Sequence, residues 1–351
     1  SHHSSRRPCC SIQALSEGVF RRIKNVKRVE WIDCAAGLMI TVVILNHCMA
    51  LAGASWIWVC LLGFRMPWFF YKAGMFYKPS DFKAQIIKDI KKLVVPFLIY
   101  SLIGFAVWAT TRIIEYDDNL PGLIVAAYRT FLRAGCILGN DPLWFLITMF
   151  LIRQIVNVLF NKNIHPLIVG FGAYLIGYGL SMAGWQNLSW WFGNMFTGLS
   201  FFAFGKWLKD KQDNRQVVVG STALYAIFII LWLIGTCEFP YLYTHANVMQ
   251  TGNYLLYLPV ALAGIIITNT FFERLQPHLK FRVLTYIGRN AMDFFVIHWI
   301  LLTLVQFIAR YCFGCTDSNH MLVIMIASCV VLLPIIVWLK NKIEKSIKKE
   351  I

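Results

Sequence analysis

The sequence predicts an all-α protein, a polytopic membrane helix bundle of about ten transmembrane helices with both termini in the cytoplasm. The 351 residues are 58% hydrophobic and 14% charged, whereas soluble domains average about 25% charged residues. Apolar stretches of roughly 20 residues, long enough to span a bilayer, recur along the chain. Lys and Arg gather in short clusters between these stretches, so the net charge of +16 indicates a membrane protein rather than one that binds nucleic acid.

A scan for such apolar stretches places the spans one by one. The predicted spans cover residues 32–52, 56–77, 93–113, 142–160, 165–183, 191–207, 217–236, 254–272, 291–309 and 320–339. Alternate loops are rich in Lys and Arg, and the positive-inside rule places these loops in the cytoplasm. The loops predicted on the outer side are EYDDN, WQNLSW, CEFPYLYTHANVMQTGN and CFGCTDSN.

Three regions follow from this pattern. Residues 1–30 form a basic cytoplasmic N-terminal segment, residues 31–340 form the membrane domain, and residues 341–351 form a basic cytoplasmic tail. The first ten residues, SHHSSRRPCC, read as an extension and carry no fold prediction.

One cytoplasmic loop predicts a helix of its own. KPSDFKAQIIKDIKKL, residues 78–93, reads as an amphipathic helix on the membrane surface, opened by Pro79 and Ser80. It fits a basic anchor for anionic lipid at least as well as any direct role in activity.

The first span carries two ionisable residues, Asp33 near its start and His47 near its end. Ionisable side chains are costly in hydrocarbon, so their presence suggests a function. At about 100° per residue the two lie on one helical stripe. A histidine can take a proton from a hydroxyl that attacks an acyl group; the alternative is a hydrogen bond between helices.

Further ionisable residues occur in other spans. Arg65 and Lys72 lie seven residues apart on one helical face, and Arg153, Asp293 and His298 belong to later spans. Such cations line a polar cavity or pair with acids or phosphates. The excess of cations suits an anionic ligand, and the alternative is a buried ion-pair network that includes Asp293.

Four blocks together resemble the acyltransferase-3 family of integral membrane acyltransferases. These blocks are WIDCAAGLMITVVILNH, RMPWFFYKAGMFYK, DPLWFLITMFLI and YIGRNAMDFFVIH. The resemblance covers roughly residues 28–340 and implies an O-acetyltransferase of bacterial surface or secreted polysaccharides, with the fucose-O-acetylase-like branch included.

The resemblance also implies roles for particular residues. The family's histidine falls on His47 as the catalytic residue, with Asp33 in support. The residues expected to line the cavity or meet the acceptor are Asn140, Trp144, Asp293 and His298.

One family position departs from the pattern. The family usually has Arg or Lys eleven residues before the histidine, and Ala36 stands there in this chain. Lys72 or Arg65 from the adjacent helix, or Arg153, is then the candidate cation for the acyl donor or the oxyanion.

The expected reaction transfers acetyl from acetyl-CoA, a co-substrate, to a hydroxyl of a polysaccharide or its lipid-linked precursor, at the inner membrane. We expect no permanently bound cofactor, no metal and no nucleic acid partner, and the sequence leaves the oligomeric state open. Two alternatives remain. One is a transporter or flippase for a glycan, with His47 in a proton relay, and the other is a catalytically inactive relative.

Overall fold

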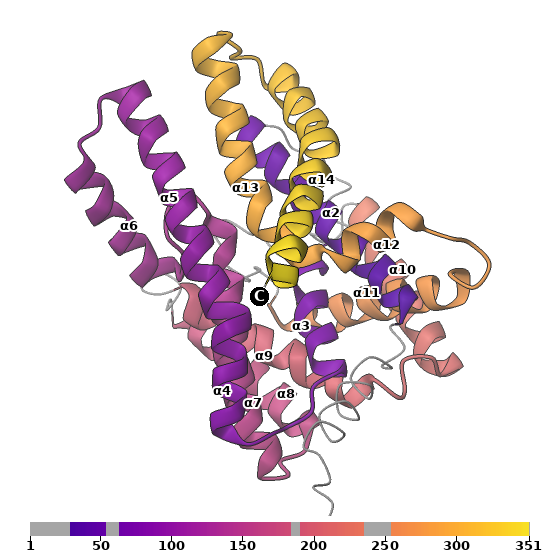
Figure 1. Cartoon of the computed structure of the whole chain (residues 1–351). Helices are drawn as coiled ribbons and strands as arrows, with labels where there is room; N and C mark the ends of the chain where they lie inside the picture. Colours follow the sequence, from indigo (N-terminus) through magenta and orange to yellow (C-terminus); the bar gives the residue numbers. More distant parts are fainter. Residues whose placement is uncertain (1–28, 54–62, 184–189, 235–253, 351) are drawn as a thin grey trace, which may run out of the picture. The chain divides into compact units, whose positions relative to one another are not determined.

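The structure is a computed structural model, and it describes residues 29–53, 63–183, 190–234 and 254–350 (Figure 1). Every regular element in these ranges is a helix. The α-helices are α2 (Glu30–Ala52), α3 (Arg65–Met75), α4 (Phe82–Asp89), α5 (Val95–Tyr116), α6 (Leu120–Ala134), α7 (Trp144–Asn161), α8 (Pro166–Met182), α9 (Trp190–Leu208), α10 (Arg215–Leu233), α11 (Tyr254–Leu275), α12 (Arg282–Arg289), α13 (Ala291–Phe307) and α14 (Ser318–Glu350). Short π- or 3-10-helical segments are η2 (Ile90–Val94), η3 (Asp141–Leu143) and η5 (Ile308–Cys312).

Seven helices within the described ranges are long and apolar enough to cross a membrane. They start at Glu30, Phe82, Asp141, Arg215, Tyr254, Ala291 and Ser318. α8 is a shorter apolar helix, and α9 has 19 mostly apolar residues. The chain is therefore a polytopic helical membrane protein.

The predicted span 56–77 lies only partly within the described residues. Its described part is α3, which has only 11 residues and is too short to cross a bilayer alone. Residues 54–62 lie outside the described residues, as does most of the basic N-terminal segment. The same holds for the loop CEFPYLYTHANVMQTGN and for all but the last residue of WQNLSW.

α6 lies where the sequence suggested only a loop between spans. Its first turn is capped by Asn119, whose side chain accepts a hydrogen bond from the backbone N–H of Gly122 at 2.8 Å. It ends at Gly135, whose φ of 69° is the left-handed conformation that favours glycine. Figure 1 shows α5 and α6 as a helical hairpin.

The amphipathic helix predicted at 78–93 is present as α4, but it does not stand apart from the next span. α4, η2 and α5 form one helix of 35 residues from Phe82 to Tyr116. Its N-terminal cap is Asp81, which accepts a hydrogen bond from the backbone N–H of Ala84, rather than the predicted Ser80. The π-helical segment η2 ends just before Pro96, a residue that cannot donate a backbone hydrogen bond.

α2 lies against α12 at backbone contact. A Cβ atom added at Gly37 would overlap the carbonyl oxygen of Leu284, and one added at Gly288 would overlap that of Asp33. Only glycine allows helices to approach so closely, as in other membrane helix pairs.

Three side-chain contacts set the register between α2 and the α12–α13 region. They join Asp33 with Arg289, His47 with His298, and Leu51 with Gln306. Their sequence separations are nearly constant, at 256, 251 and 255 residues. The two segments therefore run parallel and in register, which aligns the two histidines.

Candidate active site

His47 on α2 and His298 on α13 form a direct hydrogen bond. His47 Nδ1 lies 2.8 Å from His298 Nε2, and the two ring planes differ by 7° with centroids 5.0 Å apart. The distance between the ring centres is longer than the distance between the two nitrogens by about the width of one imidazole ring. This difference is expected when two rings meet at their edges, so the rings lie edge to edge near a common plane. His298 is fully buried, whereas His47 is half-buried, so His47 is the more accessible of the two rings.

A cavity of about 730 Å³ opens between α3, α4, η2, α7 and α13. This volume is within the range of about 300–1,000 Å³ that small-molecule sites occupy. Its lining comprises Phe69, Lys72, Ala73, Phe76, Tyr77, Lys78, Lys88, Asp89, Lys92, Leu93, Phe145, Met149, Arg153 and Met292. Five cations face one carboxylate in this set, so the cavity suits an anionic ligand with an apolar portion.

Aromatic rings connect this cavity to the histidine pair. Phe145, in the cavity wall, lies 5.6 Å from Phe295 between ring centroids, and Phe295 lies 6.1 Å from His298. Met292 lines the cavity on α13 itself, six residues before His298, which is about 9 Å along the axis. One aromatic residue therefore separates the cavity wall from the two histidines.

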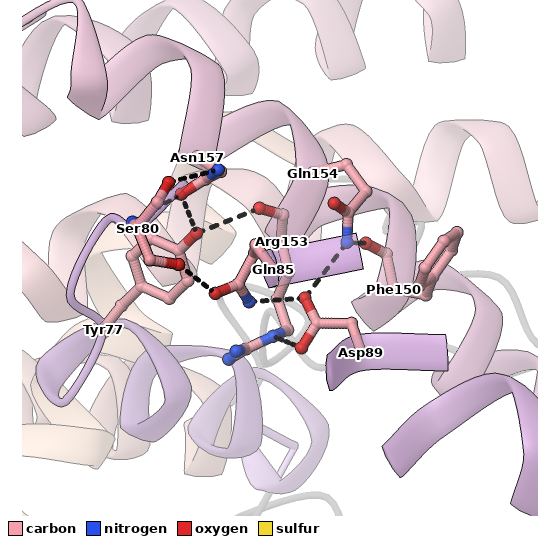
Figure 2. Close-up of polar contacts among 8 residues, drawn as sticks. All are labelled: Tyr77, Ser80, Gln85, Asp89, Phe150, Arg153, Gln154 and Asn157. Atoms are coloured by element: carbon pink, nitrogen blue, oxygen red, sulfur yellow. Dashed lines mark hydrogen bonds and ion pairs between the residues drawn. The ribbon is translucent and has the colours of Figure 1, made fainter. Parts of the chain in front are cut away.

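Arg153 is held in the cavity wall by Asp89. Its Nε donates to Asp89 Oδ1 at 2.8 Å, while Asp89 Oδ2 accepts from Gln85 Nε2 at 2.6 Å and Gln154 Nε2 at 3.0 Å. Asp89 is 1% exposed, so these three donors replace its hydration. Figure 2 shows the two terminal nitrogens of Arg153 turned away from Asp89.

The loop before α4 is fixed to α7 by a second group of hydrogen bonds (Figure 2). Asn157 accepts from the backbone N–H of Ser80 and donates to the Ser80 carbonyl, each at 3.0 Å. The Tyr77 hydroxyl donates to Asn157 Oδ1 at 3.0 Å, and the Ser80 hydroxyl donates to Gln85 Oε1 at 2.8 Å. These bonds hold α4 on α7, and so hold Asp89 beside Arg153.

Arg65 and Lys72 occupy different parts of α3. Arg65 is buried at the start of the helix. Lys72 lies about 10 Å farther along the axis, lines the cavity and has its Nζ 5.3 Å from the centre of the Trp68 ring. Lys72 therefore belongs to the cavity cations, whereas Arg65 lies outside the cavity lining.

The two acids singled out from the sequence do not meet the histidine pair. Asp33 lies 14 residues before His47, about 21 Å along the helix, and its Oδ2 is 3.4 Å from Arg289 Nε. Asp293 forms an ion pair with Lys340 at 2.8 Å, rather than with the three predicted cations. Asp33 and Asp293 thus hold helices together at the end of the protein where α2 begins.

Asn140 and Trp144 lie around the start of α7 and are both buried. Asn140 Nδ2 donates to the carbonyl of Val296 at 2.9 Å, two residues before His298. Asn140 Oδ1 is buried without a hydrogen-bond partner. Trp144 packs edge-on against Phe145. Ala36, the position of the usual family cation, is fully buried.

Asp89 and Gln85 are site residues that the sequence interpretation missed. Their spacing of four places both on one face of α4, and the adjacent pair Arg153–Gln154 is equally visible in the sequence. The abundance of Lys around them indicated an amphipathic helix that anchors to anionic lipid instead. Within the described ranges, no group of three or more His, Cys, Asp or Glu residues is placed to hold a metal ion.

Comparisons with known proteins bear on the class of reaction. The family model described as an acyltransferase domain matches residues 29–341, which include α2, the cavity and both histidines. Comparisons with curated proteins and with solved structures give no match. Because the family match spans most of the chain, this protein belongs to the acyltransferase-3 family of membrane-bound acyltransferases.

Proposed function

We propose that the protein moves an acetyl group from acetyl-CoA to a hydroxyl of a cell-surface or secreted polysaccharide, or of its lipid-linked precursor. The observation that supports this most directly is the cation-lined cavity one aromatic residue away from the histidine pair. The anionic nucleotide of the donor would bind Lys72, Lys88, Lys92 and Arg153. Its apolar arm would extend along α13 toward His47.

His47 is the general base of this reaction. It accepts the proton of the acceptor hydroxyl while the hydroxyl oxygen attacks the thioester carbonyl carbon. The carbon–sulfur bond then breaks, and the CoA thiolate leaves with the proton that His47 returns. Arg65, a buried cation at the start of α3, stabilises the negative charge that develops on the carbonyl oxygen. It thereby replaces the cation missing at Ala36.

The orientation follows the distribution of Lys and Arg. The cavity lining includes the exposed residues Lys78, Lys88 and Lys92, and the positive-inside rule assigns their side to the cytoplasm, where acyl-CoA is made. His47 lies near the C-terminal end of α2, far from the cytoplasmic end at which this helix begins. This position suits an acceptor presented from the outer side of the cytoplasmic membrane.

Labelled acetyl-CoA tests this function directly. We expect the purified protein in lipid nanodiscs to release CoA thiol and to transfer radiolabelled acetyl to membrane glycan extracts. His47→Ala should lower this rate by about 100- to 10,000-fold. A purely structural hydrogen bond in a membrane contributes only about 0.6 kcal/mol, so expression and melting temperature should change little. An active His47→Ala variant would overturn the catalytic role and favour a transport function.

A further inference from the structure

His298, the second residue of the histidine pair, has no role in the reaction as described above. We propose that His298 is a positioning residue that holds His47 in the tautomer whose Nε2 accepts the substrate proton. This inference rests on the proposed function, because it concerns the base of that reaction. Four observations support it.

The first observation is the contact on the far side of the His298 ring. His298 Nδ1 lies 2.8 Å from the carbonyl oxygen of Phe295 and 3.1 Å from that of Phe294. A carbonyl oxygen only accepts hydrogen bonds, so Nδ1 of His298 carries the hydrogen. In a neutral imidazole the other nitrogen, Nε2, then bears the lone pair.

The second observation is the contact between the rings. Because His298 Nε2 is an acceptor, the atom 2.8 Å away, His47 Nδ1, must be the donor. The near-common plane of the two rings directs this bond along the lone pair of Nε2. With its hydrogen on Nδ1, neutral His47 has its lone pair on Nε2, which is the atom that can accept a proton.

The third observation is the difference in burial between the rings. His298 is fully buried, so its part in catalysis passes through His47, which is half-buried. Trp299 packs edge-on against the His47 ring, with centroids 5.0 Å apart, and limits its rotation. His47 is therefore fixed in both tautomer and orientation, as the histidine of a catalytic triad is by its carboxylate.

The fourth observation is where the nearby acids lie. Asp33 is on the same helix as His47 but about 21 Å away along the axis, and Asp293 is paired with Lys340. A neutral histidine takes the place that a carboxylate holds in a triad, and it avoids burying a negative charge in the membrane. When Nε2 of His47 accepts the hydroxyl proton, Nδ1 keeps its hydrogen bond to His298, which stabilises the imidazolium until the thiolate takes the proton.

The test compares three variants in lipid nanodiscs. His298→Phe keeps a ring but has no acceptor, His298→Gln offers a side-chain oxygen to Nδ1 of His47, and Leu302→Ala leaves a cavity at another buried position of α13. The readouts are CoA thiol release from acetyl-CoA and NMR of isotope-labelled imidazole nitrogens, with His47 assigned by comparison with His47→Gln.

We expect wild-type His47 to carry its hydrogen on Nδ1 and His298→Phe to lose that preference. His298→Phe should lower kcat by about 100- to 10,000-fold with little change in the KM for acetyl-CoA, and His298→Gln should recover part of the loss. A wild-type His47 with its hydrogen on Nε2 would overturn the inference, whether or not His298→Phe folds. An equal kcat loss in Leu302→Ala would also overturn it. If wild-type protein releases no thiol, the proposed function fails, while the NMR result still decides the tautomer.

Discussion

At the scale of single residues, the cations of the site divide into two groups by depth. Arg65 is buried at the start of α3, outside the cavity lining, whereas Lys72 and Arg153 line the cavity. A cation near the reacting carbonyl affects the transition state, and one that holds the donor's phosphates affects binding. The two groups should therefore change different kinetic constants.

Arg65→Gln and Lys72→Gln test this division. Arg65→Gln should lower kcat for acetyl-CoA turnover by about 100- to 1,000-fold, the usual effect of losing one oxyanion donor, with a nearly constant KM. Lys72→Gln should instead raise the KM with kcat preserved. Lys83→Gln, an exposed lysine on α4 outside the cavity lining, is the control. A kcat loss in Lys72→Gln and none in Arg65→Gln would reverse the assignment.

Asp89 provides a second residue-scale prediction. Asp89→Asn removes the negative charge that holds Arg153, so the guanidinium loses its fixed orientation in the cavity wall. We expect the KM for acetyl-CoA to rise and the free energy of unfolding to fall by about 1–3 kcal/mol, typical of a disrupted buried hydrogen-bond network.

Asp118→Asn is the matched control for Asp89→Asn. It breaks the ion pair with Arg112, in which both side chains are about one-third exposed. Such surface pairs contribute about 0–1 kcal/mol, so both stability and KM should stay near wild type. Equal effects of the two variants on KM would show that Asp89 does not position Arg153 for the donor. Thermal melting and initial-rate kinetics measure the two quantities.

The sequence singled out candidate site residues but not the residues that they contact. His47, His298 and the cations stand out because ionisable residues are rare in apolar spans. Their pairing could not be predicted, because 251 residues separate the two histidines and no local pattern records which helix faces meet. For the same reason the sequence did not show that Asp293 pairs with Lys340, which lies on another helix.

At the scale of elements, hydrophobic length predicted most of the helices. The predicted spans 142–160 and 254–272 correspond to α7 and α11, with ends that differ by at most three residues. α6 and α12 were missed because they are shorter than a membrane span. The predicted span 56–77 contains α3, and its first residues lie outside the part of the chain that the structure describes.

The contact between α2 and α12 yields an element-scale prediction. Gly37→Ala would force a Cβ atom into the backbone of Leu284, so the helices must separate. Overpacking of this kind costs about 1–3 kcal/mol, and a shift of α2 would misalign His47 with His298. We expect a lower melting temperature and lower thiol release from acetyl-CoA.

Gly172→Ala on α8 is the control for this contact. A Cβ atom there meets nothing within 4 Å, and alanine favours the helix over glycine. This variant should melt at or slightly above the wild-type temperature and keep full activity. A stable, active Gly37→Ala protein would show that the backbone contact does not set the register of the pair.

At the scale of the whole molecule, the course of α5, α6 and α7 determines on which side later segments lie. α6 has 15 residues, about 22 Å, which is less than the bilayer core of about 30 Å. Asn157 and Asn161, in the last turns of α7, both donate to the carbonyl of Ser80 just before α4, so α7 ends on the side where α4 begins. Both facts are satisfied if α5 crosses the membrane once and α6 and α7 together make one return crossing.

This arrangement predicts on which sides two cysteines lie. If α6 does not cross the membrane by itself, seven predicted spans lie between Lys83 on α4 and the exposed Cys312 at the end of η5. Because seven crossings are an odd number, the two residues lie on opposite sides of the membrane. In a background without the other cysteines, a membrane-impermeant thiol reagent should label Cys312 only from the outside of intact cells. Lys83→Cys, in the same background with Cys312 replaced, should react only in inverted vesicles. Labelling of both positions from one side would mean that α6 or another short helix changes the number of crossings, and the donor cavity and the outer face would then need to be reassigned.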